Sequence, residues 1–431
     1  MKENANFILD IKRLGINGEG IGFYNRLAVF VDNAIPGEGH DVIVEKTTGN
    51  MAYAKSVGIK TPSKARVIPS CPHYYECGKC NVSHIAYNQA LKFRKDLILE
   101  SLNRYSKINY KSFEIKDADA LNDGFYYRNY TDILVKKEKG EFKGYLKTSK
   151  PIPFTDCLVT KSSIKKIVED VLTKALEVDI PEYIPKFRRG VLKGLKIGIN
   201  NLDEALVILV CNEKNSKIKS LALNLLKNEK IKGVYEEFAD ETINHLAGDT
   251  YLKETINNTI FRLYPNSYFI NNLHKYELVL KACKLAKREV VLSNSLELGL
   301  GVAKLSKELI LVEYDKELIA RMNETLKDNK LNNTKVLQGD IDLLANKLYK
   351  ENSFDVVVFD AKRYNLSSDL IESTLKYLPK RIVYVSFNPS ALARDLDKLS
   401  SKYQIKYIAL VDSEPQTALL ESIVLLELKK L

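Results

Sequence analysis

The sequence predicts a multidomain α/β protein with three parts. They are a small OB-like β-barrel over residues 1–60, a central α+β domain with a cysteine cluster over residues 61–260, and a Rossmann-like α/β domain over residues 261–431. Three observations support this division. Short strands separated by glycine turns open the chain, a tight group of cysteines follows, and apolar strands then alternate with helical segments to the end of the chain.

The composition is that of an ordinary soluble globular protein with a basic excess. Of 431 residues, 45% are hydrophobic and 28% are charged, and the formal net charge is +11. Such an excess favours a polyanionic partner, usually nucleic acid, although a lysine-rich proteome would produce the same charge. With no signal-peptide pattern and no apolar run of about 20 residues, we expect a cytoplasmic protein without membrane contact. We also expect it to be a monomer.

The barrel is predicted from the first sixty residues. Apolar residues alternate over 7–11, and glycines mark a tight turn over 18–22. A strand over 29–31, a turn over 36–38 and a further strand over 41–46 follow. Strands this short and this closely spaced predict a five-stranded barrel of the OB type, a fold that commonly binds nucleic acid, with a generic small barrel as the alternative.

The cysteines form the most specific chemical pattern in the chain. Cys71, Cys77 and Cys80 have the spacing C-x5-C-x2-C, and Cys157 is a fourth candidate further along the chain. Four such thiolates could hold an iron-sulfur cluster or a zinc ion, or they could remain reduced and unliganded. The spacing by itself does not choose among these three.

Two segments of the central part combine basic and aromatic residues. A basic helix is expected over 87–104, with Lys92, Arg94 and Lys95 on it, and an aromatic and basic stretch follows over 125–130. Rings that stack on bases and cations that contact phosphates suit RNA. Aromatic packing in the first strand of a central sheet explains the second segment equally well.

The last third of the chain reads as a parallel sheet. Apolar strands are predicted over 289–292, 308–313, 354–360 and 382–386, each followed by a helical pattern. The helix after the last of these is expected to be capped by Ser390. Because ligands bind at the carboxyl ends of the strands in such sheets, we expect the site there.

Residues 386–389 and 392–395 carry a resemblance to one family. They resemble the S-C-N-P motif and the leucine-alanine-arginine-aspartate run of the S-adenosylmethionine-dependent RNA uridine-C5 methyltransferases. In that family the cysteine is the nucleophile, and here its position is Phe387. Glu421 stands at the position of the family's general base, whereas the family's neighbouring histidine is Leu419 here.

The resemblance covers nearly the whole chain and implies a role for each part. The first sixty residues resemble a TRAM domain, an RNA-binding module, and the last part resembles the Rossmann-like methyltransferase domain. Several bacterial members carry a [4Fe-4S] cluster on a similar cysteine pattern. The resemblance therefore implies such a cluster here, with Cys71, Cys77, Cys80 and Cys157 as its ligands.

The positions that hold the methyl donor in this family are only partly kept. Glu313, Asp360 and Gly299 match the family's cofactor-binding pattern, as does Arg363. Other positions depart from it: Ile270 for the donor glutamine, Ser293 for the first-strand aspartate, Glu297 for the first glycine, and Ala361 and Lys362 for two prolines. On this pattern S-adenosylmethionine binding is doubtful.

Phe387 decides the functional prediction. Uracil carbon 5 is a poor nucleophile, and the family's thiolate activates it by adding to carbon 6; a phenyl ring has no lone pair for this step. We therefore predict a catalytically inactive RNA-binding relative, or pseudoenzyme, whose partner is structured RNA (rRNA or tRNA), for example in rRNA processing. The alternative is an active S-adenosylmethionine-dependent RNA (uracil-5-)-methyltransferase.

Overall fold

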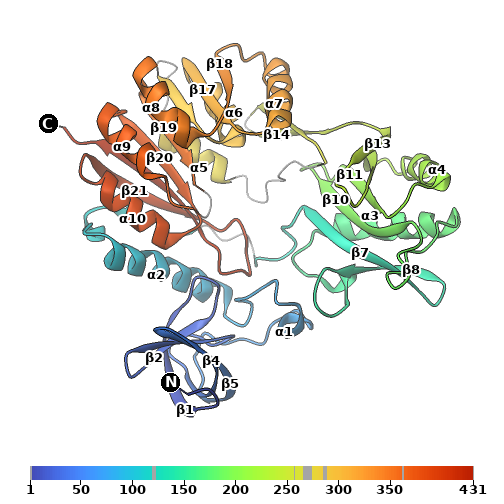
Figure 1. Ribbon diagram of the computed structural model, residues 1–431, viewed down its shortest axis with the longest axis horizontal. Helices are drawn as coiled ribbons and strands as arrows, with labels where there is room; N and C mark the ends of the chain where they lie inside the picture. Colours follow the sequence, from blue (N-terminus) through green and yellow to red (C-terminus); the bar gives the residue numbers. More distant parts are fainter. Residues whose placement is uncertain are drawn as a thin grey trace. The chain divides into compact units, whose positions relative to one another are not determined.

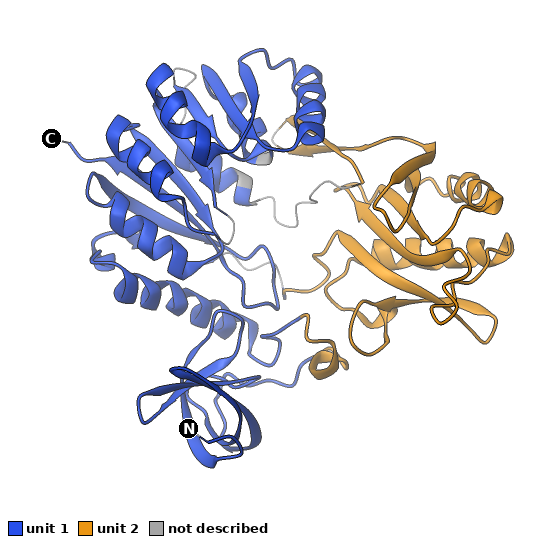
Figure 2. Cartoon of the chain, viewed as in Figure 1, with its two compact units in different colours: residues 1–69, 80–123, 272–431 blue, residues 70–79, 124–271 orange. Residues whose placement is uncertain are grey.

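The structure is a computed structural model that describes residues 2–118, 123–256, 258–265, 274–284, 289–361 and 364–430. Its contacts divide the chain into two compact units (Figure 2). Unit 1 contains Met1–Pro69, Cys80–Asp123 and Asn272–Leu431, and unit 2 contains Ser70–Lys79 and Gly124–Asn271. This division is by contacts, and the sequence boundaries near residues 60 and 260 stay a prediction. No helix in the described ranges is long and apolar enough to cross a membrane.

Unit 1 begins with a closed five-stranded barrel, which confirms that part of the sequence prediction (Figure 1). The strand order is β1-β2-β3-β5-β4. Inward residues of β1 such as Leu9 and Ile11 alternate with exposed ones, as the period of a strand requires. Gly22 lies so close to β1 that a Cβ would be 2.5 Å from the carbonyl oxygen of Asp10, which explains a glycine there. The strands are β1 (Asn6–Leu14), β2 (Gly20–Tyr24), β3 (Leu27–Val31), β4 (Gly39–Thr48) and β5 (Met51–Thr61).

The rest of unit 1 is an α/β domain around an eight-stranded sheet of order β18-β17-β16-β19-β20-β22-β21-β6. The five strands from β18 to β20 are parallel, and β22 runs antiparallel between β20 and β21. The strands are β6 (Glu114–Ile115), β16 (Val290–Ser293), β17 (Glu308–Glu313), β18 (Thr334–Gln338), β19 (Val356–Asp360), β20 (Arg381–Ser386), β21 (Tyr403–Val411) and β22 (Glu421–Leu428).

The strand order of this sheet reverses direction at β16, with β17 on one side and β19 on the other. Such a switch point opens a crevice at the carboxyl ends of the strands, where ligands bind in α/β folds. The helices of this part are α2 (Tyr87–Tyr105), α5 (His274–Cys283), α6 (Leu296–Ala303), α7 (Lys316–Asp328), α8 (Ile341–Glu351), α9 (Ser368–Tyr377) and α10 (Pro389–Leu399), with a short 3-10 turn at Tyr110–Ser112.

Unit 2 is an α+β domain. Its seven-stranded sheet has the order β13-β12-β11-β10-β7-β8-β9, and the side chains of α3 and α4 complete one hydrophobic core with it. The elements are α1 (Tyr74–Cys77), β7 (Tyr130–Glu138), β8 (Glu141–Leu146), β9 (Ile152–Pro153), a 3-10 turn at Phe154–Asp156, α3 (Ser162–Glu177), β10 (Leu192–Ile199), β11 (Ala205–Cys211), α4 (Ser216–Leu225), β12 (Ile231–Glu237), β13 (Ile243–Gly248), and the hairpin β14 (Leu252–Ile256) and β15 (Thr259–Leu263).

Candidate active site

Phe387 lies in the turn that joins β20 to α10. The side chain of Asn388 caps this helix by accepting hydrogen bonds from the backbone N–H groups of Ser390 and Ala391, both at 3.1 Å, and Pro389 takes the first helical position. The prediction that Ser390 is the cap is therefore wrong. Asn388 has extended backbone angles, which suit a cap, whereas Ser390 already lies inside the helix.

We predict that Asn388→Ala lowers the free energy of unfolding by about 1 kcal/mol, because two N–H groups lose their acceptor. Urea denaturation of the full chain measures this. Asn388→Asp keeps the acceptor and is expected to retain most of the stability. Equal losses for the two variants would contradict the capping role.

A small cavity of about 60 Å³ borders Phe387. Its walls come from the barrel, from α2, from the turn at Phe387 and from residues 418–420, all within unit 1. This volume is large enough for a few water molecules and too small for a nucleotide base. The residues that line it include no cysteine, and Cys211 and Cys283 are buried elsewhere, where burial raises the pKa of each thiol to about 12. The cavity next to residue 387 therefore has no thiolate.

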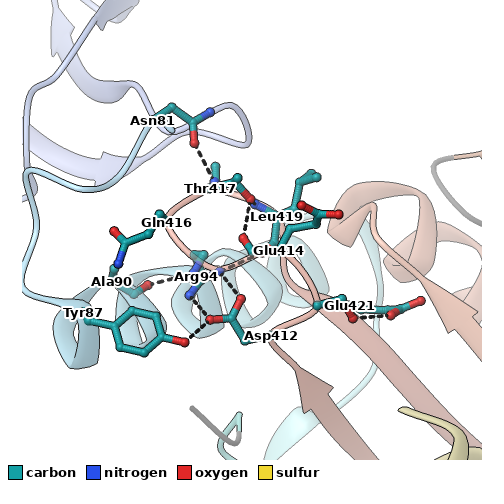
Figure 3. Close-up of polar contacts among 12 residues, drawn as sticks. Asn81, Tyr87, Ala90, Arg94, Asp412, Glu414, Gln416, Thr417, Leu419 and Glu421 are labelled. Carbon is teal, nitrogen blue, oxygen red and sulfur yellow. Dashed lines mark hydrogen bonds and ion pairs between the residues drawn. The ribbon is translucent and has the colours of Figure 1, made fainter. Parts of the chain in front are cut away.

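Residues 412–420 form the loop between β21 and β22, and Arg94 holds this loop from α2 (Figure 3). Its guanidinium donates to both carboxylate oxygens of Asp412, at 2.8 and 3.0 Å, and to the carbonyl oxygen of Leu419 at 2.8 Å. The hydroxyl of Tyr87 donates to Asp412 at 2.6 Å. Because the Arg94 side chain is fully buried, it cannot contact RNA. Arg94 therefore does not contribute to a basic RNA-binding face on this helix.

Glu421, at the predicted base position, is the first residue of β22 and is fully buried. The ammonium of Lys275 on α5 lies 2.6 Å from its Oε1, and the hydroxyl of Ser413 donates to its Oε2 at 2.8 Å. Burial raises the pKa of Glu421 above its ordinary value, although the Lys275 ammonium acts in the opposite direction. The structure thus gives Glu421 a cationic partner that the sequence pattern does not indicate.

Lys275 also contacts Phe387, the residue at the predicted nucleophile position. Its ammonium lies 5.8 Å from the centre of the Phe387 ring, within the range of a cation–π interaction. The same ammonium therefore links Phe387 to Glu421. At the predicted nucleophile and base positions this chain thus places an aromatic ring and a carboxylate, with one lysine between them.

Asp360, a predicted cofactor residue, ends β19 close enough to Glu421 for the two carboxylates to interact. Asn294 brackets its backbone: the side-chain oxygen of Asn294 accepts from the Asp360 N–H at 2.8 Å, and its amide donates to the Asp360 carbonyl at 3.3 Å. Within the described part of the chain, the Oδ1 of Asp360 is buried without a hydrogen-bond partner. A buried acceptor without a donor is costly, so this atom fits a site that a ligand would complete.

Glu313, a second predicted cofactor residue, ends β17. Its Oε1 accepts from the backbone N–H groups of Tyr314 at 2.7 Å and Asp315 at 3.0 Å, which fixes the carboxylate at the strand end. The other oxygen, Oε2, is the acceptor that ribose hydroxyls could use, as acidic residues at this place do in dinucleotide-binding folds.

Gly299, the third predicted cofactor residue, lies inside α6. Its N–H already donates to the carbonyl of Ser295 at 2.9 Å, and a Cβ at this position would lie 2.2 Å from a methyl carbon of Leu311. These contacts explain the glycine by close packing of α6 on β17. A direct role of Gly299 in cofactor binding stays a prediction.

Several of the positions compared with the family pattern lie outside the part of the chain that the structure describes. Ile270, Lys362 and Arg363 lie outside the described residues, and the side chain of Glu297 is likewise not described. Ser293, at the family's aspartate position, is fully buried, and its hydroxyl accepts from the Ser295 N–H at 3.1 Å.

The cysteine cluster is not confirmed. Three of the cysteines, Cys71, Cys77 and Cys157, belong to unit 2, whereas Cys80 belongs to unit 1. Burial raises the pKa of the Cys71 thiol above its ordinary value, and the charges of Cys157 and Cys77 raise it further. In the described ranges, no three or more His, Cys, Asp or Glu side chains are arranged to hold a metal ion. The [4Fe-4S] cluster is therefore unsupported by the described residues, and its four-cysteine ligand set stays a prediction from the family resemblance.

A different contact ties the cysteine turn to the 3-10 turn that precedes Cys157. Nε2 of His73 lies 2.8 Å from Oδ2 of Asp156, and the hydroxyl of Thr160 lies 3.3 Å from the Cys157 sulfur. The connection that a structural cluster would provide within unit 2 is therefore made, at least in part, by an imidazole–carboxylate pair.

Comparisons with known proteins give the chain its relatives. A family model described as tRNA (Uracil-5-)-methyltransferase matches residues 301–429. An uncharacterised RNA methyltransferase of Halalkalibacterium halodurans is 31% identical over 453 aligned residues, covering 99% of this chain and 97% of the relative. Another, from Enterococcus faecalis, is 29% identical over 452 residues, covering 100% of this chain and 99% of the relative.

A solved structure resembles the whole chain in fold. The Pyrococcus abyssi tRNA (uracil-54, C5)-methyltransferase, in complex with S-adenosyl-L-homocysteine, superposes with a TM-score of 0.72 at 20% identity. The match covers 97% of this chain and 100% of that one. At this identity the likeness concerns the fold, and it extends over both units of the chain.

Proposed function

This chain belongs to the family of RNA uridine-C5 methyltransferases, and from that premise we propose that its partner is structured RNA, rRNA or tRNA. The observation that carries the proposal is the match to RNA methyltransferases over almost the full length of both chains. The net charge of +11 supports it, because a basic surface attracts a phosphate backbone.

We also propose that S-adenosylmethionine is the cofactor, although several sequence motifs depart from the family's cofactor-binding pattern. The orphaned Oδ1 of Asp360 and the second oxygen of the Glu313 carboxylate support this, since the two residues end parallel strands that lie on either side of β16. Glu313 would accept hydrogen bonds from ribose hydroxyls, and Asp360 would accept one from a polar group of the ligand. When bound, the cofactor supplies an activated methyl group.

The first candidate activity is transfer of that methyl group to carbon 5 of a uridine. The comparisons favour it, because the relatives that match over their full length are named RNA methyltransferases. In this chain such a reaction must do without a thiolate at residue 387.

The second candidate is RNA binding without methyl transfer. One observation favours it: Phe387 replaces the nucleophile, and Lys275 pairs with the carboxylate at the base position. A protein of this kind would bind RNA and serve in rRNA processing or folding rather than in modification.

One set of measurements separates these proposals. The full chain is incubated with labelled S-adenosylmethionine and with rRNA or tRNA transcripts, and methyl transfer, RNA binding and cofactor binding are each measured. Transfer to uridine carbon 5 establishes the first candidate. RNA binding without any methyl transfer, measured with protein and RNA at equal concentrations, establishes the second candidate. Absence of RNA binding at low salt would refute the proposed partner.

A further inference from the structure

We propose that unit 2 has a nucleotide-binding cleft of its own, at Tyr126 and the start of α3, which takes one nucleotide of the RNA chain. The base would stack on Tyr126 and the phosphate would lie among Lys161, Lys166 and Lys230. This inference rests on the proposed function, since it assumes that the partner is RNA.

The cleft is the first observation. It encloses about 600 Å³, and its lining comes entirely from unit 2: the loop at Tyr126, the first turns of α3, and the loops at Asp203 and Lys230. This volume falls within the range of pockets that bind small ligands and nucleotides. By contrast, the cavity beside Phe387 encloses about 60 Å³.

Charge is the second observation. Three lysines and one carboxylate line the cleft, and that carboxylate, Asp203, is already engaged: Ser163 donates to it at 2.9 Å, and the Lys161 ammonium lies 4.0 Å away. Lys230 donates to the carbonyl of Leu202 at 2.8 Å. Lys166 is exposed and makes no ion pair within the part of the chain that the structure describes. The net charge of the lining therefore favours an anion.

The aromatic ring is the third observation. The side chain of Tyr126 is 48% exposed at the edge of the cleft, whereas that of Tyr127 is 7% exposed and packs inward. The sequence alone does not decide whether this stretch contacts RNA or packs in the core. In the structure Tyr127 packs in the core, and Tyr126 is exposed and available for contact. Tyr126 also has a left-handed backbone, with φ of +52°. Its N–H donates to the Leu158 carbonyl at 2.9 Å, which holds the ring outside the core despite that strain.

Together these features match a nucleotide better than a simple anion. Lysines would bind phosphate whatever is attached to it, but a half-exposed aromatic ring beside them adds a surface on which a base can stack. A second, smaller cleft in unit 2, of about 280 Å³, has two lysines, Lys214 and Lys219, but no aromatic ring. It provides the matched control.

The experiment measures binding of the full chain to a fluorescein-labelled RNA hairpin with a single-stranded, uridine-rich loop, by fluorescence anisotropy over a series of KCl concentrations. We expect Tyr126→Ala to weaken binding about 10-fold, because base stacking is lost, and Tyr126→Phe to bind as the wild type does. We expect Lys166→Glu to weaken binding and to reduce the slope of log K against log salt by about 0.7, the contribution of one phosphate of a single strand. Lys219→Glu, with the same charge change on an exposed lysine, is expected to leave both quantities unchanged.

Three outcomes would overturn the inference. If Tyr126→Ala binds RNA with wild-type affinity, Tyr126 is not a surface on which a base stacks. If Lys166→Glu and Lys219→Glu lose equal RNA affinity, RNA is attracted by the overall positive charge and not by this cleft. Saturable binding of uridine 5′-monophosphate that RNA does not compete would assign the cleft to a free nucleotide. If the wild type binds no RNA at all, the proposed function fails instead, so the two failures can be told apart.

Discussion

RNA that contains 5-fluorouridine is expected to form no covalent adduct with the wild-type protein. A stable adduct requires a nucleophile that adds to carbon 6 of the pyrimidine, and residue 387 is a phenylalanine with no cysteine lining the cavity beside it. Loss of a nucleophile costs on the order of a million-fold in rate in enzymes where it has been removed. Denaturing electrophoresis of the labelled RNA with the full chain measures the adduct. A shifted band would contradict the prediction, and mass spectrometry would then identify the nucleophile.

Phe387→Cys is the companion variant. It places a sulfur at residue 387, but Glu421 remains paired with Lys275, and the neighbouring position remains Leu419. We therefore expect methyl transfer to uridine carbon 5 to stay below about one part in a thousand of the rate of an active family member, even if an adduct forms. Full activity from this one substitution would show that the base and the cofactor site are already competent. The RNA affinity of the variant, measured in parallel, confirms that the comparison uses folded protein.

Local patterns predicted the elements of the fold well. The barrel strands and the parallel strands β16, β17, β19 and β20 follow from alternation and from short apolar runs, which depend only on neighbouring residues. The capping error at Ser390 has a local cause too. Serine and asparagine both cap helices, and the choice between Asn388 and Ser390 depends on which of them has extended backbone angles.

The site was predicted less completely because its key contacts are long-range. Nothing near Lys275 in the sequence indicates that it pairs with Glu421, since α5 and β22 meet only in the folded domain. Arg94 is different, because a signal exists. Ala90, Leu97 and Ile98 lie four residues before it and three and four residues after it, on one apolar face of α2. An arginine on that face is buried and needs a carboxylate partner, which Asp412 provides.

Lys275→Met is expected to lower the free energy of unfolding by about 3–5 kcal/mol at neutral pH. The variant removes the cation that lies 2.6 Å from a fully buried carboxylate, so Glu421 would remain charged and uncompensated or would have to bind a proton. Urea denaturation of the full chain measures the loss. Lys284→Met is the matched control, because Lys284 lies just past the same helix and pairs with Glu427 at 2.7 Å on the surface. A surface pair is worth about 0–1 kcal/mol, so a similar loss in both variants would contradict a special role for the buried pair.

The pH dependence of the same variant tests the cause. The pKa of Glu421 in the folded protein is raised above its ordinary value of 4.5, mainly by burial, so the folded state binds a proton that the unfolded state has released. Stability is then lost as the pH rises from the unfolded pKa towards the folded pKa. Removing the Lys275 ammonium raises the folded pKa further, so the deficit of Lys275→Met should be smallest near pH 4.5 and should grow towards neutrality. Adding Glu421→Gln removes the charge that needs a partner and should recover most of the lost stability, with a flat pH profile. If the deficit is independent of pH and persists in the double variant, Lys275 stabilises the fold through packing of its side chain, and the ion pair at the base position has no energetic role.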